Sequence, residues 1–150
     1  MASLLVVHHT SSPSLQAMLE AVLAGAGADE ITGVDVVVRA ALAATAVDVL
    51  AADGFVLGTS ANIGYMSGAL KHFFDLVYYP TLSAKVGAPY GLYVHGNSDT
   101  VGAARAVESI VKGLGWRRVH DDVTVIDKPD QDDLDGCWDL GATVAATLVS

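Results

Sequence analysis

The stretch that decides the fold runs from Gly54 to Tyr79 and reads GFVLGTSANIGYMSGALKHFFDLVYY. It begins with an apolar run, Gly54–Gly58, that has the length and composition of a buried strand. Small and polar residues follow from Thr59 to Met66, and a helix is predicted over Ser67–Tyr78. Because such residues leave backbone and hydroxyl groups open to hydrogen bonds, the segment between strand and helix has the chemistry of a binding loop.

The rest of the chain repeats this alternation of strand and helix, with no linker, internal repeat or low-complexity segment. In chain order, the predicted strands are Ser3–His8, Val34–Val38, Gly54–Gly58, Tyr90–His95 and Trp116–Ile126, and the predicted helices are Ser14–Ala26, Val47–Ala52, Ser67–Tyr78, Val101–Leu114 and Asp132–Leu148. Strands that alternate with helices predict a doubly wound parallel sheet with right-handed crossovers. We therefore expect one α/β domain over residues 1–150.

Composition narrows the function classes. Hydrophobic residues make up 52% of the chain but form no long apolar run, so we expect a soluble protein with no membrane span and no secretory signal. A single cysteine, Cys137, excludes an intrachain disulfide and is compatible with the reducing cytoplasm. The net charge of −9 argues against non-specific nucleic-acid binding, which needs a basic surface.

Ligand-like segments also follow the first and fourth predicted strands, and the carboxyl ends of parallel strands meet at one edge of a sheet. The segment His9–Ser14 supplies hydroxyl groups directly before a helix, which favours phosphate binding at the helix N-terminus. An ordinary capped helix with a serine-rich lead-in is the alternative reading. After the fourth strand, Gly96 permits close approach of the backbone and Asn97 offers an amide, whereas Asp99 is expected to cap the next helix. No Walker lysine is present, which argues against a nucleoside triphosphate.

The run Met66-Ser67-Gly68-Ala69-Leu70-Lys71-His72-Phe73-Phe74-Asp75, preceded by Gly58-Thr59, resembles the flavin-ring region of the flavodoxin-like NAD(P)H-dependent FMN reductases, including the quinone reductases. The resemblance implies a three-layer αβα sandwich around a five-stranded parallel sheet of order 2-1-3-4-5. It covers nearly the whole chain and is weakest at the phosphate loop. That loop has no glycine and lacks the arginine that many FMN reductases carry there.

The resemblance implies FMN as the cofactor, with a deazaflavin as the alternative, and no metal. The segment Thr59–Met66 would hold the flavin ring mainly through its main chain, with Tyr65 and Met66 as apolar cover. The residues expected to bind the cofactor are His9, Thr10, Ser11, Ser12, Ser14, Leu15, Thr59, Ser60, Ala61, Asn62, Ile63, Gly64, Tyr65, Met66, His95, Gly96, Asn97 and Asp99.

The implied function is electron transfer from NAD(P)H through the flavin to a quinone, a free flavin, or another small-molecule or protein acceptor. The flavin performs this chemistry, so no side chain is expected to be catalytic. Two other readings stay open, a non-catalytic carrier of a flavin or deazaflavin and an electron-transfer flavodoxin. Because related enzymes form dimers or tetramers, a homodimer is expected, with Tyr78, Tyr79, Pro80 and Leu82–Gly87 at its interface.

Overall fold

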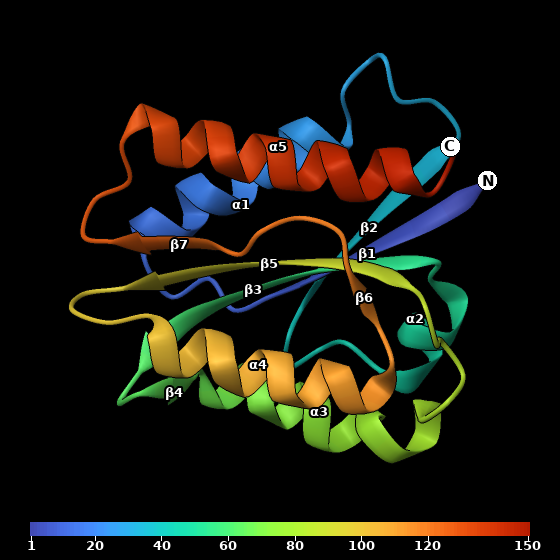
Figure 1. Cartoon of the computed structure of the whole chain (residues 1–150), viewed down its shortest axis with the longest axis horizontal. Helices are drawn as coiled ribbons and strands as arrows, with labels where there is room; N and C mark the ends of the chain where they lie inside the picture. Colours follow the sequence, from blue (N-terminus) through green and yellow to red (C-terminus); the bar gives the residue numbers. More distant parts are fainter.

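A parallel β-sheet lies between two layers of helices in the computed structural model, which describes residues 1–150 (Figure 1). Helices α1 (Pro13–Ala26) and α5 (Gln131–Thr147) cover one face of the sheet. Helices α2 (Ala46–Ala51), α3 (Gly68–Thr81) and α4 (Val101–Leu114) cover the other. The expected three-layer αβα sandwich is thereby confirmed. No helix is both long and apolar enough to cross a membrane.

The strand order also agrees with the sequence-based expectation. The strands are β1 (Ala2–His8), β2 (Val34–Ala40), β3 (Gly54–Asn62), β4 (Tyr65–Met66), β5 (Pro89–Gly96), β6 (Arg117–Arg118) and β7 (Val123–Ile126). The main sheet runs β2-β1-β3-β5-β6, and β7 also pairs with β5 in parallel. Because β6 and β7 together occupy the fifth place, this is the expected order 2-1-3-4-5.

The last strand was predicted within Trp116–Ile126, and the structure places two strands there instead of one. The segment forms two short strands, β6 and β7, with Val119–Asp122 between them outside the ladder. The polar run His120-Asp121-Asp122 interrupts the apolar alternation there, and charged side chains are poorly suited to a half-buried strand.

Two apolar cores hold the layers together, one on each face of the sheet. On the α2–α3–α4 face, Phe55 of β3 stacks on Trp116 with ring centroids 3.9 Å apart. On the other face, α1 and α5 pack almost backbone to backbone, because a side chain at Gly25 or Gly141 would overlap a carbonyl group of the facing helix. The sheet and its two helical layers therefore form one tightly packed body.

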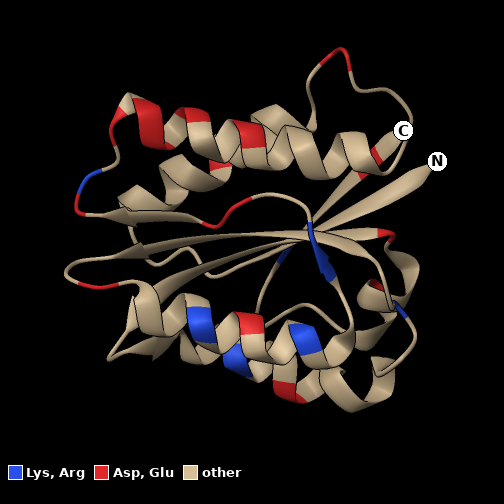
Figure 2. Cartoon of the chain, viewed as in Figure 1, with Lys and Arg blue, Asp and Glu red and all other residues tan.

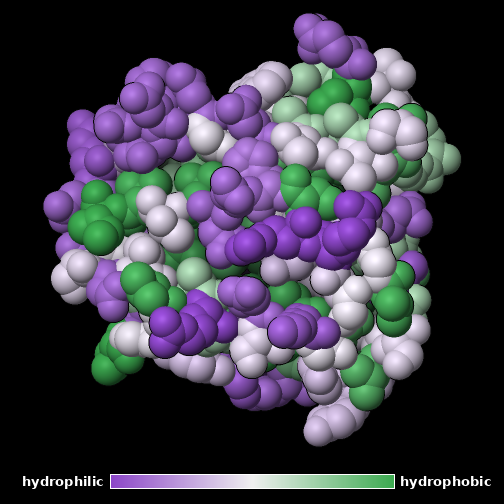
Figure 3. Space-filling view, viewed as in Figure 1, coloured by the Kyte–Doolittle hydropathy of each residue, from purple (hydrophilic) through white to green (hydrophobic).

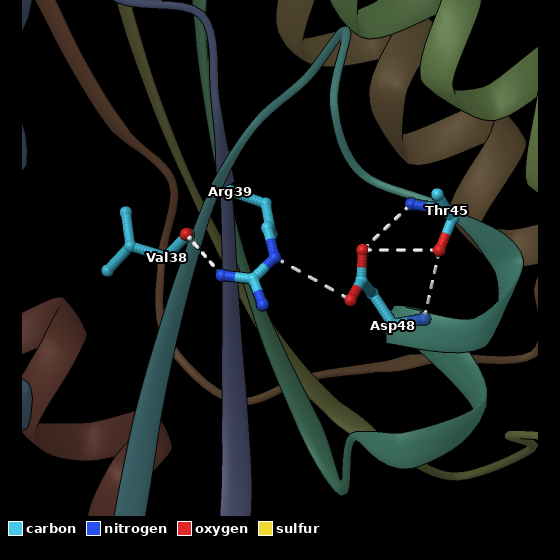
Figure 4. Close-up of polar contacts among 4 residues, drawn as sticks. All are labelled: Val38, Arg39, Thr45 and Asp48. Atoms are coloured by element: carbon cyan, nitrogen blue, oxygen red, sulfur yellow. Dashed lines mark hydrogen bonds and ion pairs between the residues drawn. The ribbon is translucent and has the colours of Figure 1, made fainter.

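Local sequence determines where several helices begin. Thr45 caps α2, and its hydroxyl accepts a hydrogen bond from the backbone N–H of Asp48 while the Asp48 carboxylate accepts one from the N–H of Thr45 (Figure 4). The same carboxylate lies 3.6 Å from Nε of Arg39 and so links α2 to the end of β2. Asp130 and Asp133 form the equivalent capping box of α5.

Candidate functional site

Three loops meet at the carboxyl ends of β1, β3 and β5, at the left-hand end of the sheet in Figure 1. They enclose a cavity of about 230 Å³. It is lined by nine residues, all of them among those expected to bind the cofactor: Ser11, Ser12, Leu15, Ser60, Ala61, Asn62, His95, Gly96 and Asn97. The structure therefore brings together segments up to 86 positions apart in the chain, from Ser11 to Asn97.

One wall of the cavity is the beginning of α1. Pro13 is the first helical residue, and the Ser12 hydroxyl accepts a hydrogen bond of 3.2 Å from the backbone N–H of Leu15. Pro13 has no N–H, so the backbone N–H groups of Ser12 and Ser14 are the ones left without a partner within the helix. The helix dipole adds partial positive charge at this end. Ser11 is exposed and contributes a further hydroxyl. This wall is suited to an anion.

The floor of the cavity contains a polar group without a partner. Ser60 and His95 are directly paired on adjacent strands β3 and β5, so both side chains lie on the α1–α5 face of the sheet. Ser60 is only 9% exposed, and its Oγ is buried without any hydrogen-bond partner. An unpaired buried hydroxyl is destabilising by roughly 1–3 kcal/mol, so its presence beside an open cavity points to a ligand.

His95 has a defined protonation pattern at one ring nitrogen. It is 8% exposed, and its Nε2 lies 2.6 Å from the carbonyl oxygen of Asp127. Because a carbonyl oxygen only accepts hydrogen bonds, Nε2 carries a proton. Nδ1 forms no hydrogen bond with the protein. Asp127, whose φ is 64°, also donates its backbone N–H to the Gly96 carbonyl at 3.2 Å.

The segment Thr59–Met66 was predicted to be a loop, and the structure corrects this to a β-hairpin. β3 continues through Asn62 and pairs with β4 in antiparallel fashion, Ala61 opposite Met66 and Asn62 opposite Tyr65. Ile63 and Gly64 make the two-residue turn with φ values of 50° and 74°. Positive φ at both positions is the geometry of a tight hairpin turn, and it is strained for a β-branched residue such as Ile63.

Five expected site residues in this hairpin lie outside the cavity lining, and three of them are on or near its strands. Met66 is 2% exposed and packs in the core beneath α3 and α4, so it does not cover the cavity. Thr59 is fully buried, and its hydroxyl donates to the Ser60 carbonyl and accepts from the N–H of Ser67. Tyr65 is 41% exposed on the surface. Strand alternation places Thr59 on the opposite face from Ser60, a consequence of β3 extending further than predicted.

The remaining expected residues are near the cavity without lining it. Ser14 lies beside a second cavity with Lys128 and Pro129. The Thr10 hydroxyl is 2.7 Å from Nδ1 of His8, and burial, helped by the adjacent His9, lowers the pKa of His8. Ile63 and Gly64 are exposed at the tip of the hairpin, and His9 has a buried Nδ1 with no partner.

Asp99 behaves as the sequence indicates. Its carboxylate accepts a hydrogen bond of 2.9 Å from the backbone N–H of Val101, the first residue of α4. The contact of His95 with Asp127 had no signal in the sequence, because it joins positions 32 residues apart across two strands.

Charge is unevenly distributed around the molecule. Carboxylates cluster along the N-terminal half of α5 and the loop before it, whereas most basic side chains lie on α3, α4 and β6 (Figure 2). The surface over this part of α5 is accordingly hydrophilic (Figure 3). The nine residues that line the cavity include no lysine or arginine.

Comparison with known proteins agrees with this geometry. The family model for NADPH-dependent FMN reductase matches residues 32–129. A flavodoxin from Aquifex aeolicus (strain VF5) is 36% identical over 75 residues, which amount to 50% of this chain and 40% of that flavodoxin. This chain therefore matches less than half the length of that relative.

Solved structures show the same fold at low sequence identity. A flavodoxin from the domain Archaea is 21% identical, covers 99% of both chains and superposes with a TM-score of 0.82. A WrbA-like flavodoxin from Agrobacterium tumefaciens, also 21% identical, covers 99% of this chain and 98% of its own, with a TM-score of 0.81. At these identities the likeness shows the flavodoxin fold alone. The family match, over more than half of the chain, shows that this protein belongs to the NADPH-dependent FMN reductase family.

Proposed function

We propose that FMN binds in the cavity between α1, β3 and β5, with its phosphate at the start of α1. The observation that carries this proposal is Ser60, which lines the same cavity as Ser11 and Ser12 and whose buried hydroxyl has no protein partner. Hydroxyl and backbone N–H donors at a helix N-terminus match the oxygens of a phosphate. The residues present therefore fit the phosphate end of FMN.

The flavin ring would lie between the hairpin tip and the loop after β5. Asn62 from the hairpin and Gly96 and Asn97 from the loop line that side of the cavity. A side chain at Gly96 would collide with the Asp99 carbonyl group, so this loop depends on glycine for its tight course. The strained, fully exposed Ile63 supports a ligand-binding role for the hairpin, because such backbone strain clusters at functional sites.

The proposed activity is that of an NAD(P)H-dependent reductase that passes electrons to a quinone, a flavin or another acceptor. Bound FMN would supply the hydride and electron chemistry. The protein's own residues would position it: α1 would hold the phosphate, and Ser60 and Asn97 would hydrogen-bond its polar groups. We propose that residues 1–150 act as one flavin-binding domain, which the single sheet supports.

A second candidate function is electron transfer in the manner of a flavodoxin. The similarity to the Aquifex aeolicus flavodoxin favours it, at 36% identity over 75 residues. A non-catalytic flavin carrier is the third reading. The deazaflavin alternative has no support in the family or in the similar structures, so it serves only as a comparison ligand.

Anaerobic titration separates these functions. Protein loaded with FMN would be mixed with NADPH or NADH, and the visible absorbance of the oxidised flavin would be followed. A reductase bleaches on addition of nicotinamide. A flavodoxin keeps its colour until an electron-donor protein or dithionite reduces it, in separate one-electron steps. Failure of FMN to bind would overturn the proposed function altogether.

We further propose that the protein is a homodimer. A cavity of about 360 Å³ lies between α3 and α4 and is lined by Lys71, Phe74, Asp75, Tyr78, Tyr79, Ser109 and Ile110. Tyr79 is 80% exposed, and Leu76, Leu82 and Val86 are also exposed nearby in the chain. Large apolar side chains exposed together favour burial against a second copy.

A further inference from the structure

The cavity presents a charge problem for an anionic ligand. A phosphate monoester carries between one and two negative charges near neutral pH. The protein itself has a net charge of −9, and none of the residues lining the cavity is a lysine or arginine. Lys128, in the loop after β7, does not line this cavity but lines a second cavity together with Ser14. The helix N-terminus supplies only partial positive charge.

His95 is the one residue of the cavity lining that can become a cation. The other eight are serine, leucine, alanine, asparagine or glycine. Its Nε2–H is held by the Asp127 carbonyl, so the neutral ring keeps its lone pair on Nδ1. Nδ1 has no hydrogen-bond partner in the protein. A second proton would therefore be taken up at Nδ1 without breaking the contact with Asp127.

We propose that His95 supplies the positive charge for the phosphate of the bound flavin by taking up one proton from solvent at Nδ1. This inference rests on the proposed function, because it requires FMN in this cavity. Imidazole is the side chain whose charge changes between about pH 5 and 8, so phosphate binding in this range can recruit a proton to it. A charge-assisted hydrogen bond from Nδ1–H to the phosphate is stronger than one between neutral groups.

The other charged groups around His95 modulate this proton uptake. β3 and β7, its neighbours in the sheet, contain no titratable side chain, and α1 contains only Glu20, which is exposed. On β5 the titratable groups are Tyr93 and, in the core on the opposite face, Tyr90. The others on nearby elements are Asp99 in the following loop, His8 and His9 at the end of β1, Asp127 and Lys128 after β7, and Asp130, Asp132, Asp133, Asp135, Cys137 and Asp139 on or before α5.

Proton uptake fixes the direction of the pH dependence. Binding that takes up a proton weakens as the pH rises, by up to about tenfold for each pH unit over the range in which His95 loses its charge. The phosphate of free FMN loses its own second proton near pH 6, which affects every protein variant alike. A comparison between variants at each pH therefore isolates the contribution of His95.

The matched variant is His95→Gln. The amide nitrogen of glutamine can take the place of Nε2 and donate to the Asp127 carbonyl, but glutamine has no counterpart of Nδ1 and never becomes a cation. His72→Gln serves as the control, because His72 is exposed on α3 and lies outside the cavity. Dissociation constants of FMN and of riboflavin, which lacks the phosphate, would be measured by flavin fluorescence between about pH 6 and about pH 8.5.

The expected result is that His95→Gln weakens FMN binding about tenfold at the acid end and leaves it nearly unchanged at the alkaline end. For riboflavin, the ratio of dissociation constants between His95→Gln and wild type should be independent of pH. Calorimetry in two buffers of unlike ionisation enthalpy should show more proton uptake on FMN binding to the wild-type protein than to His95→Gln. His72→Gln should follow the wild type throughout.

Three results would overturn the inference, and they are distinguishable. In the first, the ratio of FMN dissociation constants between His95→Gln and wild type is constant with pH, while FMN still binds more tightly than riboflavin. This result would support the phosphate site but show that His95 is not part of it. In the second, the ratio of dissociation constants changes with pH in the same way for FMN and for riboflavin. This result would mean that His95 interacts with the flavin ring and not with the phosphate. Absence of binding of either flavin would overturn the proposed function itself. If His95→Gln does not fold, proton uptake by the wild-type protein is compared between FMN and riboflavin at about pH 7.5, where the phosphate of free FMN has already lost its second proton. Equal uptake for the two flavins would overturn the inference.

Discussion

Ser60 carries a hydroxyl that the folded protein buries without a partner, three positions before the turn of the β3–β4 hairpin at Ile63. Ser60→Ala should weaken FMN binding by about 1–2 kcal/mol, roughly tenfold, through loss of a hydrogen bond to the ligand. The same substitution should leave the ligand-free protein equally stable or more stable, because it removes an unpaired buried group. Fluorescence titration and urea unfolding would measure the two effects. Weaker binding together with clear destabilisation would show that the hydroxyl has a structural role.

The two serines on either side of the α1 cap have different surroundings. Ser11 lines the proposed flavin cavity, whereas Ser14 lies beside the cavity with Lys128. Ser11→Ala should therefore weaken FMN binding by about 1 kcal/mol, and Ser14→Ala should have little effect. Riboflavin binding should be insensitive to both substitutions, because it has no phosphate. Equal losses for Ser11→Ala and Ser14→Ala would show that the phosphate extends toward Lys128.

Asp122 gives the stability of the protein a defined pH dependence. Burial raises the pKa of this carboxyl group, and Arg118, whose guanidinium lies 3.6 Å away, opposes the shift only in part. The folded state therefore holds this proton more tightly than the unfolded chain, so stability is lost as the pH rises past the ordinary carboxyl range. Asp122→Asn should raise the free energy of unfolding at pH 7 and lose that advantage below about pH 4.

Urea unfolding at both pH values would test this effect, with the exposed Asp121→Asn as control. A less stable Asp122→Asn protein at pH 7 would mean that the attraction of Arg118 outweighs the burial of the carboxylate.

At the scale of elements, α4 holds the β3–β4 hairpin in place by direct backbone contact. A side chain at Gly102, in the first turn of α4, would overlap the carbonyl oxygen of Gly64 at the hairpin turn. Gly102→Ala should therefore move the hairpin away from α4, lower the stability by about 1–3 kcal/mol and weaken flavin binding. Overpacking against backbone cannot be relieved by a change of rotamer.

Gly68→Ala is the matched control for this prediction. Gly68 also lies in the first turn of a helix, α3, and a side chain there meets no atom within 4 Å. Alanine should stabilise this helix by up to about 1 kcal/mol, and flavin affinity should be preserved. Equal behaviour of the two variants would show that the contact between α4 and the hairpin is dispensable.

At the scale of the whole molecule, the cluster of carboxylates and the proposed dimer surface are on different sides. The carboxylates gather on the α5 side, and the proposed dimer surface with Tyr79 and Leu82 belongs to α3 and the loop after it (Figure 2). Tyr79→Lys combined with Leu82→Lys should convert a dimer into monomers, since charged side chains are disfavoured in an apolar interface. Sedimentation velocity would measure the change. A wild-type protein that sediments as a monomer would refute the dimer.

Much of the architecture could be predicted from the sequence because its signals are local. The apolar run at Leu4–Val7 indicates a strand covered on both faces, and Ser12, with Pro13 after it, marks the start of α1. The doubly wound arrangement then places the loops after β1, β3 and β5 at one edge of the sheet. The strand order itself came from the family resemblance, because hydrophobic periodicity carries no information about which strands are neighbours.

Tertiary structure alone decided what the cavity contains. The pairing of Ser60 with His95 depends on the register of β3 and β5, and a slip of one residue in either strand would turn that strand's side chain to the other face. The same alternation of side chains along β3 turns Thr59 into the core, and Met66 of β4, which pairs with Ala61 of β3, also points there. The contact between His95 and Asp127 requires β7 to lie beside β5, which joins positions 32 residues apart. Sequence therefore determined the elements and the edge of the sheet where we propose that a ligand binds, and packing between distant strands determined which atoms line the cavity there.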